Sequence, residues 1–234
     1  TEGDWIDTPD NITLSITMTG RGNSVEITTR IFDIENNNAL LFEKTVTDTP
    51  EADALDTGVD SPATSFIGKT GNFVLLLYHN DGTGALPASS ITLDNAKVYQ
   101  YESVMIDDFN DNKVTGWEKF DFGSGNGLFK EQDGQFTISM HQATGQPFFV
   151  AATYAGEKFT IKDGVTLEFR VDLIEANQAE AYAVVGFIPS DTPVSKLSGY
   201  SLAKDSNDVL LAKGRNKYFY DIPEGDRIDT PDKI

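Results

Sequence analysis

Residues 12–34 have the sequence ITLSITMTGRGNSVEITTRIFDI. Two runs rich in β-branched residues, 12–20 and 24–34, alternate in polarity on either side of the break Arg-Gly-Asn. A period of two is typical of strands that bury one face, and a short glycine-containing break is typical of a hairpin turn. The stretch therefore predicts a β-hairpin.

The same pattern fills most of the chain. Strands are also predicted at 39–47, 72–80, 89–101, 135–142, 158–174, 181–189, 199–205, 208–214 and 217–222. The nearly continuous apolar run NFVLLLYHN (72–80) fits a central strand, and the best helix candidate, 50–56, has one or two turns at most. Many short strands with regular turns predict an all-β, antiparallel two-sheet β-sandwich (jelly roll) with little or no helix.

One stretch occurs twice. GDWIDTPDNI (3–12) returns as GDRIDTPDKI (225–234), and with Glu2 and Glu224 nine of eleven aligned positions match at an offset of 222. A period of this size predicts a tandem array of large domains. The two mismatches favour diverged copies.

Composition narrows the function classes. The chain has no cysteine, which excludes disulfides, thiolate metal sites and cysteine nucleophiles. With 37 acidic against 18 basic residues, the net charge of −19 disfavours binding to nucleic acid or to an anionic membrane. No run is long and apolar enough to predict membrane insertion, and no signal peptide is expected within these residues. An acidic surface fits solubility or, alternatively, Ca²⁺ binding.

Several motifs together resemble one family. They are IDDFND with GW at 116–117, DGQFTIS (133–139), DGVTLEFRVDL (163–173), VVGF (184–187) and GYSLAKD (199–205), with LDNAKVY at 93–99. The chain resembles laminin-G-like, concanavalin-A-like jelly-roll repeats of large bacterial secreted proteins, in permuted order. The resemblance implies that 103–234 is the N-terminal half and 1–102 the C-terminal half. The sandwich would close within the chain or with neighbouring copies. The fold hosts lectins, glycan-binding modules, glucanases and structural modules alike.

No catalytic constellation is found. The two histidines, His79 and His141, are isolated. The nearest match to the glucanase pattern of paired carboxylates is Glu51, Asp53 and Asp56, which lacks the final Glu and follows a proline. We therefore expect a protein that is not an enzyme.

The resemblance implies one structural Ca²⁺ where the first and last strands of the domain meet. The positions that correspond are Asp94 at the close and Asp107 or Asp108 at the opening, with Asp111 as a further candidate. Carboxylate and carbonyl oxygens suit this cation. The alternative is that these aspartates are turn and edge residues.

Two further kinds of surface site are predicted. Exposed aromatic rings that could stack on sugars are Trp5, Trp117, Tyr218 and Tyr220, although most aromatics of a sandwich belong to its core. Candidate glycosylation sites are Asn11 in Asn-Ile-Thr and the hydroxyls of the Asp-Thr-Pro and Asp-Ser-Pro motifs, namely Thr8, Thr49, Ser61, Thr192 and Thr230. The alternative for these motifs is turn chemistry.

The sequence thus predicts an extracellular structural or interaction module on a bacterial surface. It would be the repeat unit of a tandem or polymeric protein, and its partners would be copies of itself. The alternative is a carbohydrate-binding module of a secreted polysaccharide-acting protein.

Overall fold

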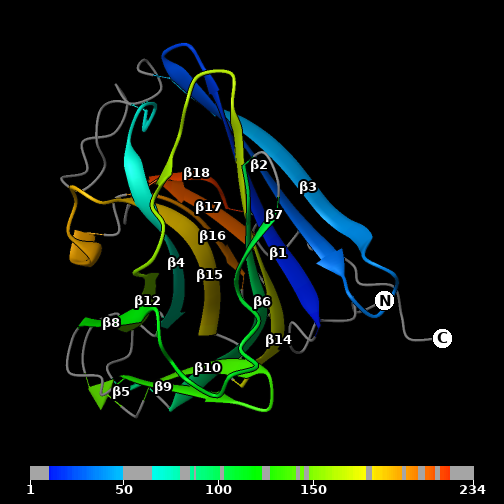
Figure 1. Ribbon diagram of the computed structural model, residues 1–234, viewed down its shortest axis with the longest axis vertical. Coiled ribbons are helices and arrows are strands. Elements are labelled where there is room, and N and C mark those ends of the chain that lie inside the picture. The colour runs from blue at the N-terminus through cyan, green and yellow to red at the C-terminus, as the bar shows by residue number, and fades with distance from the viewer. Residues whose placement is uncertain are drawn as a thin grey trace.

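The computed structural model describes residues 11–49, 65–79, 85–86, 88–100, 103–122, 127–140, 143–144, 148–177, 181–196, 199–204, 209–213 and 217–221. These residues form two antiparallel sheets packed face to face (Figure 1). The predicted all-β two-sheet sandwich is confirmed. The one helical element in the described part is a single 3-10 turn, η2 (Val194–Lys196). The predicted helix at 50–56 lies outside these residues.

The first sheet has the order β3-β2-β1-β14-β6-β10-β9, with β7 also paired to β6. Its strands are β3 (Ala39–Asp48), β2 (Ser24–Asp33), β1 (Ile12–Arg21), β14 (Thr166–Ala176), β6 (Ser89–Tyr99), β10 (Gln135–Met140), β9 (Gly127–Gln132) and β7 (Ser103–Asp107).

The second sheet has the order β18-β17-β16-β15-β4-β12-β8, with β13 also paired to β4. Its strands are β18 (Lys217–Asp221), β17 (Val209–Lys213), β16 (Tyr200–Lys204), β15 (Ala181–Pro189), β4 (Thr70–His79), β12 (Phe148–Tyr154), β8 (Trp117–Phe122) and β13 (Phe159–Thr160). A ribbon of β5 (Ala85–Leu86) and β11 (Ala143–Thr144) lies apart from both.

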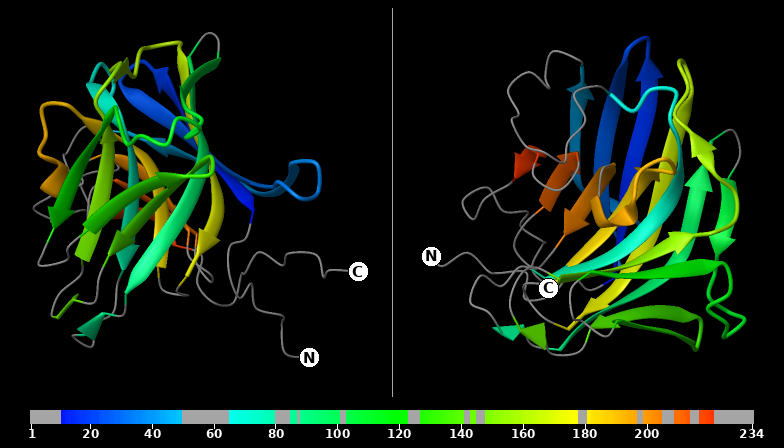
Figure 2. Two further views of the ribbon diagram at one scale, coloured as in Figure 1. Left: turned by 60° about the horizontal axis from the view of Figure 1, so that its bottom comes forward. Right: turned by 90° about the vertical axis from the view of Figure 1, so that its left-hand side faces the viewer.

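Strands from before and after residue 102 are interleaved in both sheets. In the first sheet, β1 lies between β2 and β14, and in the second β4 lies between β12 and β15. Both views in Figure 2 show the blue strands of the chain's beginning beside the yellow β14. The two parts of the chain therefore share both sheets within one molecule.

The hairpin at 12–34 forms as predicted. β1 and β2 pair from Ile12↔Asp33 to Arg21↔Ser24, which leaves Gly22 and Asn23 as a two-residue turn. Gly22 has a φ of 68°, a left-handed conformation that glycine adopts without steric cost. Alternate residues of β2 are buried, as the period of two requires.

The central position of β4 explains its continuous apolar run. Phe73, Leu75 and Leu77 face the main core between the sheets. Val74 and Leu76 belong to a second apolar cluster, together with residues such as Phe149. A strand buried on both faces has no need of alternating polarity, so the central strand expected at 72–80 is confirmed.

One predicted strand is divided. The run 158–174 forms β13 and then β14, and Gly164 between them has a φ of 70°. The chain turns here because Asp163 and Gly164 favour a turn over an extended conformation. The strands β5, β7, β8, β9, β11 and β12 were not among those predicted.

A buried polar cluster links the two sheets. Asp48 at the end of β3 accepts hydrogen bonds from the hydroxyl of Tyr200 and from Nζ of Lys213, the latter at 3.0 Å. Asp48 and Lys213 are fully buried and form an ion pair at 2.9 Å. The backbone N–H of Phe66 donates to the Tyr200 hydroxyl at 3.1 Å. We call Asp48, Tyr200 and Lys213 the Asp48 cluster.

Candidate functional site

The loop that follows β7 is shaped by its own aspartates. Asp107 Oδ1 accepts the backbone N–H of Phe109 at 2.9 Å, and Asp111 Oδ1 accepts that of Lys113 at 2.8 Å. Asp108 makes the same contact with the N–H of Asn110 at 3.3 Å. Aspartate readily bonds an N–H two residues further on, so IDDFNDN folds locally into successive turns. We call residues 107–116 the acidic loop.

Trp117 anchors the loop to the core. Its Nε1–H donates to Asp107 Oδ2 at 2.9 Å, and its ring stacks against Phe136. The residue is only 7% exposed and also contacts Phe73 and Tyr154. A buried ring offers no open face to a sugar, so this structure does not place Trp117 as the glycan platform that the sequence suggested.

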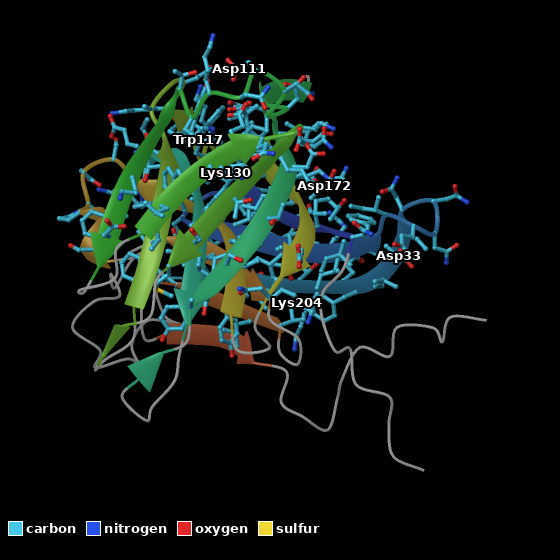
Figure 3. All side chains as sticks on the ribbon, turned by 90° about the horizontal axis from the view of Figure 1, so that it is seen from below. Asp33, Asp111, Trp117, Lys130, Asp172 and Lys204 are labelled. Atoms are coloured by element: carbon cyan, nitrogen blue, oxygen red, sulfur yellow. The ribbon has the colours of Figure 1, made fainter. Side chains whose placement is uncertain are left out.

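The acidic loop also rests on the β9–β10 turn. Asn112 Oδ1 accepts the backbone N–H of Asp133 at 3.2 Å. A Cβ added to Gly134, which has a φ of 77°, would lie 2.8 Å from Asn110 Oδ1. The left-handed φ of Gly134 therefore favours glycine at this turn, and a larger residue would also displace the Asn110 side chain. Figure 3 shows Asp111 and Trp117 at the same end of the molecule as Lys130 of β9.

Glu131 of β9 lies next to this loop. It is 7% exposed, and no group lies in good hydrogen-bond geometry with either carboxylate oxygen, although the backbone N–H of Lys113 and the Asp111 side chain lie near enough to act on it. Burial raises the pKa of its carboxyl, the N–H of Lys113 opposes this rise, and the Asp111 side chain and the charge of Asp107 add to it. Glu131 was not among the predicted site residues. The signal that could have found it is the alternation of GLFKEQ, which places Glu131 on the same face as Phe129.

Asp94 belongs to a different set of contacts. Its Oδ1 accepts the N–H of Asn95 at 2.6 Å, and Asn95 Nδ2 donates to Asp172 Oδ2 at 3.0 Å. Burial raises the pKa of Asp94, the N–H of Asn95 opposes this rise, and the charges of Asp172 and Asp108 add to it. The aspartates predicted as calcium ligands thus divide between two environments.

No ready-made metal centre is present in the part of the chain that the structure describes. No group of three or more histidine, aspartate or glutamate side chains is arranged to hold an ion there. The charge of Asp108 acts on Asp94, whereas Asp107 and Asp111 act on Glu131. The calcium prediction therefore stays a prediction.

The outer face of the first sheet carries a groove of about 440 Å³. It is lined by Thr13, Phe32, Ile34, Asn38, Asn95, Lys97, Tyr99, Arg170 and Asp172. The guanidinium carbon of Arg170 lies 4.9 Å from the centre of the Phe32 ring and 5.8 Å from that of Tyr99. The groove thus combines aromatic rings with charged and amide groups, and the sequence did not single out its rings.

The remaining predicted residues can be placed only in part. Trp5, Thr8, Ser61 and Thr230 lie outside the described residues, as do the weak carboxylate candidates and His141. Tyr218 and Tyr220 lie on β18, where the register shifts between Leu211 and Ala212 of the facing strand.

The other glycosylation candidates are partly covered. Asn11 donates from Nδ2 to Glu35 Oε1 at 2.7 Å. Thr192 donates to Asp191 Oδ1 at 3.4 Å. Thr49 directly follows Asp48 and is half-buried. Glycosylation of these three residues stays a prediction.

No protein-family model matches the chain, and no curated protein shows significant similarity to it. Among the described residues, no helix has the length and apolar character needed to cross a bilayer.

Proposed function

We propose that the chain is an extracellular structural module, one repeat unit of a tandem or polymeric surface protein. The proposal rests on one observation. The GD-x-IDTPD-x-I stretch recurs at an offset of 222, and the described strands of that period, apart from the short ribbon of β5 and β11, pair with one another in two sheets. One period of the sequence then corresponds to one sandwich, and successive copies need no strand from a neighbour.

The order of the strands supports the laminin-G-like, concanavalin-A-like interpretation. In that interpretation β6 is the last strand of the family pattern and β7 the first. The two are consecutive in this chain and pair antiparallel, from Tyr99↔Ser103 to Ala96↔Asp107. A permuted jelly roll requires this adjacency. Placement on a bacterial surface rests on the resemblance and on the acidic, cysteine-free composition.

Electron microscopy of the native material, combined with its intact mass, tests the structural role. We expect beaded chains or filaments and a polypeptide whose mass contains several 222-residue periods. A native product with a single period that forms only isolated monomeric particles would contradict the proposal.

A carbohydrate-binding role is the second candidate, and the groove on the first sheet favours it. Sugars bind proteins through ring stacking combined with hydrogen bonds from charged and amide groups, and the groove supplies both. Tyr99 and Phe32 offer rings, while Asn95 and Asp172 offer polar atoms beside them. This role is compatible with a structural one, because the groove occupies one face of a single sandwich.

A glycan array with and without EDTA tests this second role. Tyr99→Ala should reduce any binding at least tenfold. Tyr182→Ala is the matched control, since Tyr182 is also half-buried but lies on the second sheet against Tyr78. An absence of binding, or equal loss in both variants, would remove the groove as a glycan site.

A further inference from the structure

The Asp48 cluster brings an amine and a carboxyl group together where the two sheets meet. Tyr200 and Lys213 lie directly opposite each other in the β16–β17 pair, so their side chains leave the second sheet on the same face. Asp48, at the end of β3, reaches them from the first sheet. The side chains of Asp48 and Lys213 are 0% exposed. Two groups 165 residues apart in sequence are therefore held in contact away from solvent.

The contact has the geometry of a reacting pair. Lys213 Nζ lies 3.0 Å from Asp48 Oδ1 and 2.9 Å from Oδ2. The carbon between these oxygens, Cγ, is then about 3–3.5 Å from the nitrogen, which is the separation of a near-attack conformer. Two groups held in this way react as if one were present at about 10⁵–10⁸ M. The geometry thus favours a bond between Nζ and Cγ.

Aromatic rings cover the pair. The centre of the Phe66 ring is 5.6 Å from Lys213 Nζ and 4.8 Å from the centre of the Tyr200 ring. A buried charge is more costly than a buried neutral group, so transfer of a proton from Nζ to the Asp48 carboxylate is less unfavourable here than in water. The transfer leaves a neutral amine, the nucleophilic form of lysine, beside a carboxylic acid.

Tyr200 places a proton donor on the same carboxyl group. Its hydroxyl donates to Asp48 Oδ2 and accepts the backbone N–H of Phe66 at 3.1 Å. These bonds fix the hydroxyl at an oxygen on which negative charge develops when a nucleophile attacks Cγ. The hydroxyl can also protonate that oxygen as it leaves.

We propose that Asp48 and Lys213 condense to an intramolecular isopeptide bond, which links β3 covalently to β17. One proton passes from Nζ to Oδ2, and the lone pair of Nζ then attacks Cγ. The Cγ–Oδ2 bond breaks, and a second proton from Nζ reaches Oδ2 through the Tyr200 hydroxyl. The products are a secondary amide and one water molecule, so the step needs no oxidant or other reactant.

An exposed ion pair of the same chain provides an internal control. Lys69 Nζ lies 2.7 Å from Asp191 Oδ2, which is closer than the buried pair, but the two side chains are 49% and 60% exposed. Water hydrates both of these charges, so contact alone should give no amide there. The proposed bond goes beyond the structural and glycan-binding roles and depends on neither.

Intact-mass spectrometry of the denatured full chain tests the bond. The chain should be lighter than its sequence by the mass of one water molecule. Protease digestion should give one branched peptide that contains Asp48 and Lys213, while the peptides that carry Lys69 and Asp191 stay separate.

Two variants identify the reacting groups. Lys213→Arg keeps a cation beside Asp48 but removes the nucleophile, because arginine stays protonated, and it should have the full mass of its sequence. Tyr200→Phe should slow formation of the bond at least tenfold, measured as the linked fraction over time after refolding. Circular dichroism checks that both variants are folded.

The proposal is overturned if the folded original chain keeps the full mass of its sequence after prolonged incubation. It is equally overturned if Lys213→Arg also loses water. A loss that maps to Asp133 and Gly134 would overturn it too, because an Asp-Gly pair loses one water when it forms a succinimide. The digest of the original chain decides the outcome even where a variant does not fold.

Discussion

Two buried carboxylates of the same sandwich, Asp48 and Glu131, have opposite surroundings. Asp48 is fully buried and receives bonds from Tyr200 and Lys213, so the chain itself neutralises it. Glu131 is 7% exposed, and no group is in good hydrogen-bond geometry with either of its oxygens. Asp48 therefore has an internal cationic partner. Glu131 has none among the described residues.

The two carboxylates show that burial of a charged group does not by itself decide whether that group stabilises the fold. A buried ion pair is weak evidence for stability, but removal of one partner leaves an uncompensated charge and is costly. A buried acid without a partner is already in that costly state, so removal of its charge should help the fold. The two sites should therefore respond to neutralising substitutions with opposite signs.

The largest effect should come from Lys213→Met. It leaves Asp48 buried with Tyr200 alone, and we expect a loss of roughly 3–5 kcal/mol in the free energy of unfolding, measured with urea. The double variant Asp48→Asn/Lys213→Met removes both charges and should recover part of this loss. A cost below about 1 kcal/mol for the single variant would show that the ion pair does not matter to the fold.

Glu131→Gln should act in the opposite direction. Loss of a buried charge that has no cationic partner among the described residues should raise the free energy of unfolding by roughly 1–3 kcal/mol, measured with urea at pH 7. Glu118→Gln, which neutralises an exposed acid on β8, serves as the control, and a destabilised Glu131→Gln chain would contradict the comparison.

The effect of Asp94 on the free energy of unfolding should be intermediate in size and should depend on pH. Its raised folded pKa means that the native state binds its proton more readily than the unfolded chain, whose ordinary value is 3.8. The charged form costs stability above the folded pKa, and this cost disappears as the pH falls toward 3.8. Asp94→Asn should therefore be more stable near pH 7, by less than about 1 kcal/mol because the group is partly solvated.

The measurement for Asp94 is the urea midpoint of both chains between pH 7 and pH 3. The advantage of Asp94→Asn should shrink steadily over the lower part of that range. An advantage that grows as the pH falls would show that the folded pKa of Asp94 is lowered rather than raised.

The smallest change in stability should come from an exposed ion pair. Lys69 Nζ lies 2.7 Å from Asp191 Oδ2, with both side chains about half exposed or more, at 49% and 60%. The hydrogen bond from Lys69 lowers the pKa of Asp191. Lys69→Met should return that pKa toward 3.8, as NMR titration would show, without a measurable shift in the urea midpoint at pH 7. A midpoint shift comparable to that of Lys213→Met would contradict the ranking by burial.

The sequence predicted most of the fold because the strands that carry the core have clear patterns. The hairpin at 12–34 and the apolar run of β4 are examples. Burial of one face gives alternating polarity along a strand, and burial of both faces gives a continuous apolar run. Strand β9 was not predicted, because its inner face includes Glu131, which interrupts the apolar pattern.

The candidate sites were harder to predict because they depend on contacts distant in sequence. Asp107 and Asp111 were found from the local motif, but their neighbour Glu131 lies 20 residues beyond Asp111. Trp117 looked like an exposed ring because composition cannot tell a core aromatic from a surface one. The groove on the first sheet joins β1, β2, β6 and β14, a combination that only the sheet order defines.

The place of β14 between β1 and β6 has a consequence for synthesis on the ribosome. The hairpin β1–β2 can pair as soon as it emerges, but Thr166, the first residue of β14, is translated 145 residues after Arg21 ends β1. At about 5–20 residues per second, the other edge of β1 waits roughly 7–30 s for its partner. In a tandem array the matching strand of a neighbouring copy would compete for that edge, so translation speed would help decide which copies fold separately.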